Sequence, residues 1–315
     1  MRVLVTGGGG FIGSHVVDAL LASGEYEVRV LDNFATGRRS NLTHCLARIE
    51  VVEGDIRDLE TVEAAVDGVW CILHQAALPS VPRSIKAPNT TNDVNVGGTL
   101  ALLTAARKAG VERVVMASSS SVYGNEGPLP RTEDQPTRPL SPYAVSKLAS
   151  EQYCSIFSRL YGMETLCFRY FNVFGPRQDP TSQYAGVIAR FVDAALSGQS
   201  YVVYGDGQQA RDFTYVENVV HANMLAVTAS ELHGEIVNVA CGGKVTLLDL
   251  GRAIDGAVGR TTPVIHEPER LGDVKESQAD IEAARRLLGY EPRVGLVEGI
   301  ARTVEWHRTQ APDAG

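Results

Sequence analysis

Tyr143 and Lys147 lie four positions apart, a spacing that places two side chains on the same face of a helix. Tyrosine has an ordinary pKa of about 10, but a nearby positive charge lowers the pKa and makes the phenol a better base. We therefore predict that Tyr143 is a general base and that Lys147 helps to activate it. Ser141 and Pro142, just before them, are typical of the N-cap and first residue of a helix.

Four consecutive serines, Ser118 to Ser121, follow an apolar run that predicts a strand over 113–118. In open parallel sheets, ligands bind beyond the carboxyl ends of the strands. A serine hydroxyl at this position could therefore reach the same substrate oxygen as Tyr143. A tyrosine and a lysine at this spacing are common on exposed helices, so the serine run is what favours a catalytic site.

A glycine-rich segment, TGGGGFIG over 6–13, stands between a predicted strand (2–6) and a predicted helix (12–23). Such glycines permit a tight turn, close approach of the backbone to a pyrophosphate, and close packing of helix on strand. Asp32, at the end of the next predicted strand, suits a ribose 2′-hydroxyl and would repel a 2′-phosphate. These features predict a dinucleotide, with NAD favoured over NADP. Arg38 and Arg39 are the residues that argue for NADP.

These residues need a scaffold of short buried strands that alternate with helices. Most of the apolar runs are continuous, as expected for parallel strands covered on both faces, so we predict an α/β fold with a doubly wound parallel sheet of the Rossmann type. The predicted strands are 2–6, 27–32, 49–55, 69–77, 113–118 and 164–171, with crossover helices such as 59–66 and 97–109.

The regular alternation of predicted strands and helices ends after residue 175, where proline, glycine and polar residues dominate. The strands predicted beyond this point are short (201–205, 211–216, 236–240 and 263–268). We therefore expect 1–175 to be the NAD-binding domain and 176–315 to be mainly a smaller C-terminal α/β lobe for the substrate. The segment 236–240 resembles a buried strand that returns to the main sheet.

The composition of the chain argues against several classes of binding partner. The 315 residues carry a formal net charge of −8, which gives no electrostatic attraction for nucleic acid. No apolar run approaches the ~18–20 residues of a membrane span. The five cysteines are odd in number and scattered, so we expect neither disulfides nor a metal site, and we expect a cytoplasmic location.

Further motifs make the chain resemble the extended short-chain dehydrogenase/reductases of the NAD-dependent sugar-nucleotide epimerase/dehydratase family, from the N-terminus to about residue 306. These motifs are LDNFATG (31–37), GDIRD (54–58), HQAA (74–77), NVGGT (95–99), SSSSVYG (118–124), YAVSK (143–147), RYFNVFGPR (169–177), GDGQQARDFTYV (205–216) and RLGD (270–273). Within the family the chain looks closest to UDP-glucose and UDP-N-acetylglucosamine 4-epimerases.

The resemblance implies roles for individual residues. It makes Ser119, Tyr143 and Lys147 the catalytic residues. It assigns NAD binding to Gly7, Gly10, Phe11, Ile12, Gly13, Asp32, Asn33, Asp55, Ile56, Ala76, Asn95, Tyr143 and Lys147. It assigns the UDP-sugar to Ser120, Ser121, Asn172, Arg211, Arg270 and Ser277, with the two arginines on the diphosphate. It also implies a homodimer formed through the helix that bears Tyr143 and the helix near 97–109.

The type of reaction follows from two positions in the serine run. Members of the family that are dehydratases carry an Asp-Glu pair where this chain has Ser120 and Ser121, and decarboxylases carry a glutamate there. Without these carboxylates, the resemblance implies a 4-epimerase that inverts the sugar C4 by transient hydride transfer to tightly bound NAD.

The substrate is implied by Ser277, which stands where the family places a gatekeeper beside the sugar C2 substituent. A small residue there admits N-acetyl groups, so we expect UDP-GlcNAc and UDP-GalNAc as substrates together with UDP-Glc and UDP-Gal. UDP-glucuronate 4-epimerases are the first alternative. They tend to carry threonine at the position of Asn172, but Arg190 could pair with a carboxylate. An NADPH-dependent nucleotide-sugar 4-reductase and a non-catalytic dinucleotide-sensing regulator are more distant alternatives.

Overall fold

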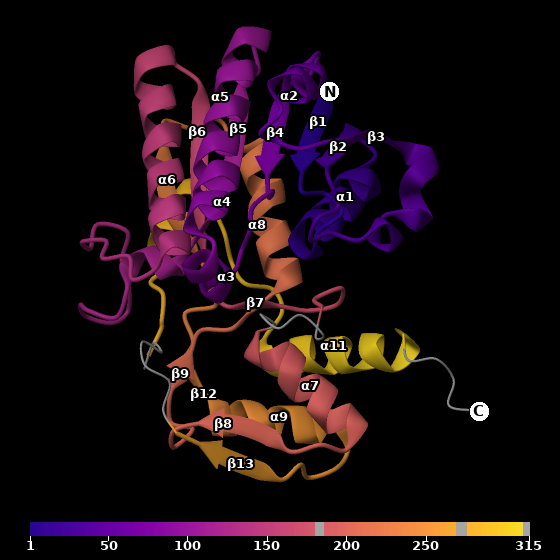
Figure 1. The fold of residues 1–315 in the computed structure, drawn as a ribbon, viewed down its shortest axis with the longest axis vertical. Helices are drawn as coiled ribbons and strands as arrows, with labels where there is room; N and C mark the ends of the chain where they lie inside the picture. Colours follow the sequence, from indigo (N-terminus) through magenta and orange to yellow (C-terminus); the bar gives the residue numbers. More distant parts are fainter. Residues whose placement is uncertain (180–185, 269–275, 311–315) are drawn as a thin grey trace.

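A single seven-stranded parallel sheet forms the centre of the computed structural model, which describes residues 1–179, 186–268 and 276–310 (Figure 1). The strand order is β11-β6-β5-β4-β1-β2-β3. The strands are β1 (Arg2–Thr6), β2 (Glu27–Asp32), β3 (Ile49–Glu53), β4 (Cys71–His74), β5 (Arg113–Ser119), β6 (Glu164–Tyr170) and β11 (Glu235–Val239). The predicted doubly wound α/β fold is confirmed.

Both faces of the sheet are apolar, because successive side chains of each strand enter different cores. Val3 and Val5 of β1 join the core under α1 (Phe11–Ser23) and α8 (Val216–Thr228). Leu4 joins the core on the other face. That face is covered by α2 (Leu59–Val66), α5 (Gly98–Ala109) and α6 (Pro142–Tyr161). The result is a three-layer α/β/α domain.

The strand order reverses between β1 and β4, which are neighbours in space but not in sequence. In open α/β sheets this switch point, at the carboxyl ends of the strands, is where ligands bind. The glycine-rich loop follows β1 and the HQAA segment follows β4, so both predicted cofactor loops reach the same point. In Figure 1 the carboxyl ends of the strands face the smaller lobe.

The smaller lobe is built from helices and three two-stranded sheets, β10-β7, β12-β9 and β13-β8. Its strands are β7 (Val173–Phe174), β8 (Tyr201–Tyr204), β9 (Ala210–Arg211), β10 (Thr214–Tyr215), β12 (Val245–Thr246) and β13 (Val264–Glu267). The helices that follow β7 outside the sheet layers are α7 (Val187–Ser197), α9 (Leu247–Val258) and α11 (Leu296–Gln310), whereas α10 (Glu282–Leu288) packs against β11 and α8.

Short helical turns complete the fold. They are the 3₁₀ turns η1 (Arg39–Asn41), η2 (Thr43–Arg48) and η4 (Ser120–Tyr123), the π-helical turn η3 (Asp93–Gly97), and the short helices α3 (Val81–Lys86) and α4 (Pro88–Asn92). The turn η3 leads directly into α5, so the predicted helix over 97–109 starts one residue later and continues a π-helical turn. π-Helical turns are rare and frequently lie at functional sites.

Two predicted strands differ from the structure. The run at 211–216 contains two separate short strands, β9 and β10, which pair with different partners because the chain turns between them. The run at 69–77 forms a strand only over Cys71–His74, because the backbone beyond His74 leaves the sheet toward the switch point. Among the described residues, the structure contains no helix long and apolar enough to cross a membrane.

Candidate active site

The glycine-rich loop forms a closely packed cradle at the switch point. A Cβ atom added to Gly13 would lie 2.1 Å from the Gly7 carbonyl oxygen, so only glycine allows α1 to start so near β1. Gly7 adopts φ of 71° and faces the Ala76 backbone, where a Cβ atom would lie 2.7 Å from the amide nitrogen. Gly10 is the N-cap of α1 and gives it no side-chain cap, which leaves the amides of the first turn, at Phe11 and Ile12, for a phosphate.

Asp32 closes the side of this cradle. Its Oδ2 accepts the Gly9 amide at 2.8 Å, and its Oδ1 accepts the Phe34 amide at 2.7 Å. Burial raises the pKa of Asp32, while the two amide donors lower it. A carboxylate has about four acceptor sites, so this one retains capacity for ribose hydroxyls. The loop and the acid therefore fit a dinucleotide whose ribose carries a free 2′-hydroxyl.

The two arginines that argued for NADP are engaged with carboxylates. Arg38 lies 2.7 Å from Asp179, and Arg39 pairs with Glu53 and lies over the Phe34 ring. These ion pairs are exposed and therefore individually weak. They nevertheless direct both guanidinium groups to protein partners, which agrees with NAD as the preferred dinucleotide.

The other predicted NAD residues line the same edge. Asn33 donates to Asp55 at 2.9 Å, and hydrogen bonds from Arg57 hold the pKa of Asp55 down at about 2. The Ala76 amide donates to Thr6 Oγ1 at 3.3 Å. Ile56 is buried against α5, where a Cβ atom on Gly98 would lie 2.5 Å from its Cδ1.

The three predicted catalytic residues meet beside β5. Ser119 is the last residue of β5, and its hydroxyl hydrogen-bonds the phenol of Tyr143. Ser141 caps α6 by accepting the Ala144 amide at 3.2 Å, which places Tyr143 in the first turn and Lys147 one turn later. The buried Lys147 Nζ donates to the Ala117 carbonyl at 2.8 Å.

The protein alone does not favour the charged forms of this group. Burial raises the pKa of Tyr143, and the Ser119 hydrogen bond lowers it only in part. Burial also lowers the pKa of Lys147 to about 8. Desolvation therefore opposes both charged forms, and the predicted activation of Tyr143 depends on a positive charge brought by the bound cofactor as well as on Lys147.

A directed hydrogen-bond chain lies beneath the cofactor cradle and was not predicted. Thr99 Oγ1 donates to the Asn95 carbonyl at 2.5 Å, so it must accept from His74 Nε2, 3.0 Å away. His74 Nδ1 is then the acceptor, and it receives Thr6 Oγ1 at 2.6 Å. Burial lowers the pKa of His74 to about 3, so the imidazole is neutral and has a single tautomer. The chain joins the cradle to the π-helical turn.

Asn95 connects this chain to the catalytic helix. Its Oδ1 accepts the Leu78 amide at 2.8 Å, and its Nδ2 donates to Ser146 Oγ at 2.9 Å. Its carbonyl also accepts Ser150 Oγ at 3.0 Å. In this structure the Asn95 side chain thus positions the loop after β4 and the helix that bears Tyr143.

A buried ion pair supports the next turns of α6 and was also not predicted. Arg169 of β6 donates to Glu151 of α6 through Nε at 3.0 Å and Nη2 at 2.8 Å, and Ser118 Oγ also donates to Glu151. The side chains of both charged residues are almost fully buried. The pair fixes α6 to β6, and the Glu151 charge raises the pKa of Lys147 slightly against desolvation.

Two of the predicted substrate residues, Asn172 and Ser277, contact each other beyond the carboxyl end of β6. Asn172 Nδ2 donates to Ser277 Oγ at 3.1 Å and to the Asp212 carbonyl at 2.9 Å, and the Ser277 amide donates to the Ala210 carbonyl at 3.0 Å. Arg211, at the end of β9, belongs to the same neighbourhood. Arg270 lies outside the described residues.

Ser120 and Ser121 begin η4, immediately after Ser119. The Ser121 amide donates to Ser119 Oγ at 3.2 Å, so this turn orients the catalytic hydroxyl. Among the described residues, the Ser121 Oγ atom is buried and has no hydrogen-bond partner, which suits a group that awaits a ligand.

Asp212 holds the substrate side together, although its sequence context gave no sign of this. Its two oxygens accept the Cys241 amide at 3.1 Å and the Ala279 amide at 3.2 Å. Burial raises the pKa of Asp212 to about 6. The acid thus joins three segments that are far apart in the chain.

Comparison with known proteins gives one consistent result. Residues 3–240 match the model of the NAD dependent epimerase/dehydratase family. The UDP-glucose 4-epimerase of Mycolicibacterium smegmatis is 42% identical over 315 residues, which cover 99% of this chain and 100% of that protein. The structure of Thermus thermophilus UDP-glucose 4-epimerase with NAD is 40% identical, with a TM-score of 0.89, and covers 99% of this chain and 100% of its own. The UDP-N-acetylglucosamine 4-epimerase of Methanobrevibacter ruminantium, solved with UDP-N-acetylmuramic acid, is 37% identical, with a TM-score of 0.93 and 98% coverage of both chains.

Proposed function

The chain belongs to the NAD-dependent epimerase/dehydratase family and uses NAD as its cofactor, and from this premise we propose that it is a UDP-sugar 4-epimerase. The proposal rests most directly on the meeting of Ser119, Tyr143 and Lys147 beside serines, not carboxylates, at the start of η4. This arrangement can oxidise and reduce a carbinol carbon, but it offers no acid for elimination.

The chemistry begins at the phenol. Tyr143 takes the proton of the sugar 4-hydroxyl, and Ser119, hydrogen-bonded to the phenol, holds the same oxygen. Oxidised NAD, held by the glycine-rich loop and Asp32, would supply the positive charge that Tyr143 lacks and the capacity to take up and return the C4 hydride. The 4-keto sugar turns over in the site and is reduced on its other face, while Tyr143 returns the proton.

Serines at 120 and 121 separate this activity from others in the family. A dehydratase needs an acid and a base to remove water next to the keto group, and a hydroxyl of ordinary pKa can do neither near neutral pH. Ser121 Oγ is buried without a partner among the described residues, and we propose that it hydrogen-bonds the substrate.

We further propose that UDP-GlcNAc and UDP-GalNAc are substrates, together with UDP-Glc and UDP-Gal. Ser277 is small, and its hydroxyl is held by Asn172, so the side chain leaves space beside a sugar C2 substituent. Arg211 and Arg270 would bind the diphosphate. UDP-glucuronate remains the alternative. Its supporting residue, Arg190, is exposed on α7, which makes it a weak candidate for a carboxylate partner.

A substrate panel tests this proposal. The purified enzyme, with no added nicotinamide, should convert UDP-GlcNAc and UDP-Glc to their C4 epimers, which chromatography separates from the substrates. A requirement for stoichiometric NADPH would indicate a reductase. Turnover of UDP-glucuronate alone would favour the alternative substrate, and an absence of turnover with bound NAD would favour a sensor.

The outer face of α6 supports a homodimer. Val145, Ile156 and Leu160 are exposed at helical spacing on this helix, beside α5. We propose that a second copy covers them. Light scattering should give about twice 33.9 kDa, and a monomer mass would contradict the proposal. Free thiols at all five cysteines agree with a cytoplasmic location.

A further inference from the structure

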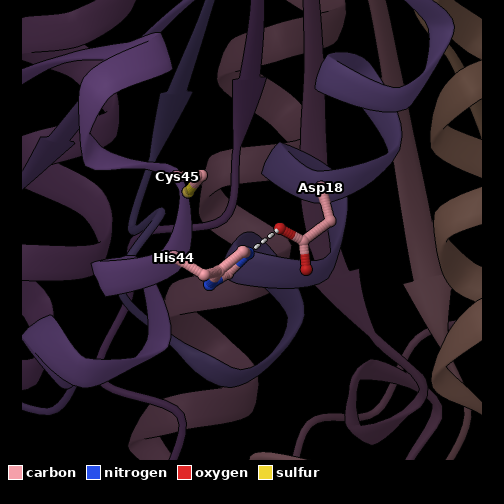
Figure 2. A group of neighbouring side chains, drawn as sticks. All are labelled: Asp18, His44 and Cys45. Carbon is pink, nitrogen blue, oxygen red and sulfur yellow. Dashed lines mark hydrogen bonds and ion pairs between the residues drawn. The ribbon is translucent and has the colours of Figure 1, made fainter.

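A compact group of metal-binding side chains lies apart from the active site, between α1 and η2. Figure 2 shows Asp18 on α1 and His44 on η2 pointing toward one another, with Cys45 beside them. His44 Nε2 is 2.7 Å from Asp18 Oδ1, and a donor atom of each of the three residues lies within 4.8 Å of the other two. None of these residues is used by the cradle or by the catalytic group.

The donor set has a definite chemical preference. One carboxylate oxygen, one imidazole nitrogen and one thiolate sulfur are ligands of zinc and of similar borderline transition metals, whereas calcium and magnesium prefer oxygen alone. A divalent ion held by Asp18 and a deprotonated Cys45 would have its two charges balanced. His44 is half-exposed, which leaves a fourth position for water.

The His44–Asp18 pair requires only a small adjustment. Zinc lies about 2.0–2.2 Å from nitrogen and oxygen ligands in tetrahedral sites, so those two ligands are about 3.3 Å apart. The His44–Asp18 separation of 2.7 Å would therefore open by roughly half an ångström, which rotation of the half-exposed His44 ring allows.

Arg177 orients the carboxylate. Its Nη2 lies 2.7 Å from Asp18 Oδ2, the oxygen that does not contact His44. Metal-binding carboxylates are commonly hydrogen-bonded in this way through the second oxygen. Arg177 also has a positive φ of 66°, unusual for a residue with a side chain, so the surrounding structure holds it in place at a cost in backbone strain.

We propose that Asp18, His44 and Cys45 bind one zinc-like divalent ion, which fastens η2 to α1. The scattered cysteines had suggested no metal site, because the histidine and the aspartate are 26 positions apart and meet only through packing.

This site is linked to the cofactor cradle by the chain segment just before η2. The Gly9 carbonyl accepts the Arg38 amide and Asn41 Nδ2, each at 2.9 Å. An ion that fixes η2 therefore also restrains the segment that rests on the glycine-rich loop. Bound metal should slow the loss of NAD as well as stabilise the fold.

The test uses the NAD-loaded enzyme and two metal ions. Titration with Co²⁺ should give one ion per chain and a thiolate-to-cobalt absorption band, and Zn²⁺ should abolish that band by displacement. Saturating Zn²⁺ should raise the melting temperature by a few degrees. Cys45→Ser should remove the band, and His44→Gln should weaken binding at least tenfold.

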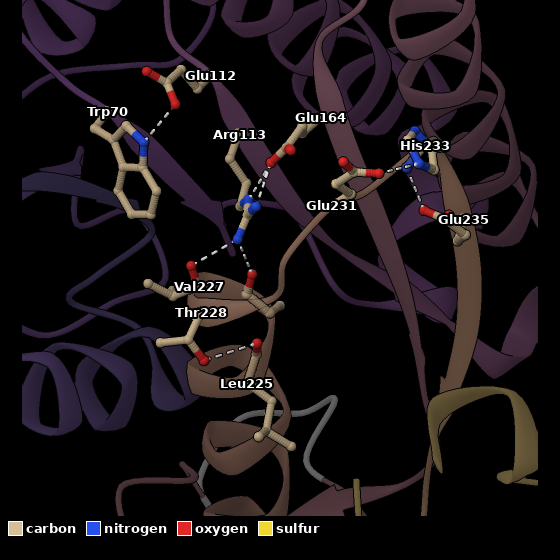
Figure 3. A network of polar contacts seen from close by, with 11 residues as sticks. Trp70, Glu112, Arg113, Glu164, Leu225, Val227, Thr228, Glu231, His233 and Glu235 are labelled. Atoms are coloured by element: carbon tan, nitrogen blue, oxygen red, sulfur yellow. Dashed lines mark hydrogen bonds and ion pairs between the residues drawn. The ribbon is translucent and has the colours of Figure 1, made fainter. Parts of the chain in front are cut away.

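Matched controls come from elsewhere in the chain. Figure 3 shows His233 beside Glu231 and Glu235, an exposed histidine with carboxylate neighbours. His233→Gln and Cys241→Ser should leave both the stoichiometry and the band unchanged. The proposal is overturned if the wild-type enzyme binds no Co²⁺, or if the band persists in Cys45→Ser. It is equally overturned if His44→Gln binds Co²⁺ as tightly as the wild type, since His44 is half-exposed and its replacement leaves the core intact.

Discussion

The expected cofactor site and the expected substrate site, called here the cofactor side and the substrate side, are built in different ways. The cofactor side is formed by loops that follow strands of the central sheet, and most of its contacts are to backbone, such as the Gly9 amide on Asp32. The substrate side joins residues far apart in sequence, with 105 positions between Asn172 and Ser277. Its nearby strands β9 and β12 have two residues each. Hydrogen bonds that Asn172 donates and the Asp212 carboxylate accepts replace sheet structure there.

Because of this difference, we expect cofactor binding and substrate choice to depend on different parts of the molecule. We expect a cradle made from sheet loops and backbone amides to be rigid and to select one cofactor. A substrate surface held by a few side chains can change its ligand when one residue changes. The predicted catalytic residues lie on the cofactor side, on β5 and α6, so we expect the chemistry to survive changes in substrate choice.

Of the substitutions that test this difference, Tyr143→Phe should have the largest effect on activity. Loss of the general base should reduce kcat about 10²–10⁴-fold while the enzyme still retains NAD, because the glycine-rich loop and Asp32 are unchanged. Steady-state kinetics and cofactor content after purification check both parts. Tyr161→Phe, at the far end of the same helix, is the matched control. Near-normal activity in Tyr143→Phe would refute its assignment as the base.

His74 makes the cofactor side sensitive to acid. Its pKa is about 3 in the folded protein because of burial, against an ordinary value of 6.5, so the unfolded chain takes up a proton first as the pH falls. Its contribution to stability is therefore lost between pH 6.5 and 3, on the order of 5 kcal/mol at the limit. Urea unfolding at several pH values measures this. Below pH 6.5 the free energy of unfolding should fall less steeply with decreasing pH in His74→Gln than in His233→Gln. Equal slopes would contradict the buried neutral imidazole.

Asp212 should give the substrate side the opposite response. Burial raises its pKa to about 6 from 3.8, so the folded protein holds the proton more tightly and this contribution to stability is lost as the pH rises from 3.8 through 6. The effect is on the order of 3 kcal/mol. Asp212→Asn should remove this loss in the same unfolding series. If its pH dependence equals that of the wild type, Asp212 is not the group that titrates.

Asp32→Ala tests the cofactor side alone. A hydrogen bond to a charged group contributes about 1.5–3 kcal/mol, so NAD should bind roughly ten- to a hundredfold more weakly, with the substrate KM unchanged at saturating NAD. Calorimetry on the cofactor-free protein measures the affinity. Glu53→Ala, at the edge strand and paired with Arg39, is the control. Unchanged NAD affinity would remove Asp32 from the ribose site.

Ser277→Tyr tests the substrate side alone. A large ring at this position should block N-acetylated sugars and spare UDP-Glc, which lowers the ratio of their kcat/KM values at least tenfold. Ser197→Tyr, on an exposed part of α7, is the control. Equal losses on both substrates would show that Ser277 does not select the C2 substituent.

The elements around the expected cofactor site could be predicted from the sequence because their signals are local. The glycines at the end of β1, the acid at the end of β2 and the Ser-Pro start of α6 each act within a few residues. The parallel sheet followed from continuous apolar runs, which alternate between the two cores.

The unpredicted residues depend on burial, which no short pattern reveals. His74 stands in the HQAA motif, but its tautomer is fixed by Thr6 and Thr99, which lie 68 and 25 positions away. Asp212 resembles a surface acid in the sequence, because the Cys241 and Ala279 amides that bind its carboxylate come from distant segments. The segment 211–216 was predicted as one strand because its apolar pattern does not show that the chain turns between β9 and β10.

The edge strand β11 has a consequence for the growing chain. It pairs with β6 through Leu166 and Glu235, which are separated by the whole of α7 and β8 and by β9, β10 and α8. During synthesis, β6 therefore emerges with one side unpaired until the later segment arrives. An open strand edge of this kind readily pairs with other chains, so the nascent protein is exposed to aggregation over that interval, and a ribosome that stops before Val239 would release a chain with an incomplete sheet.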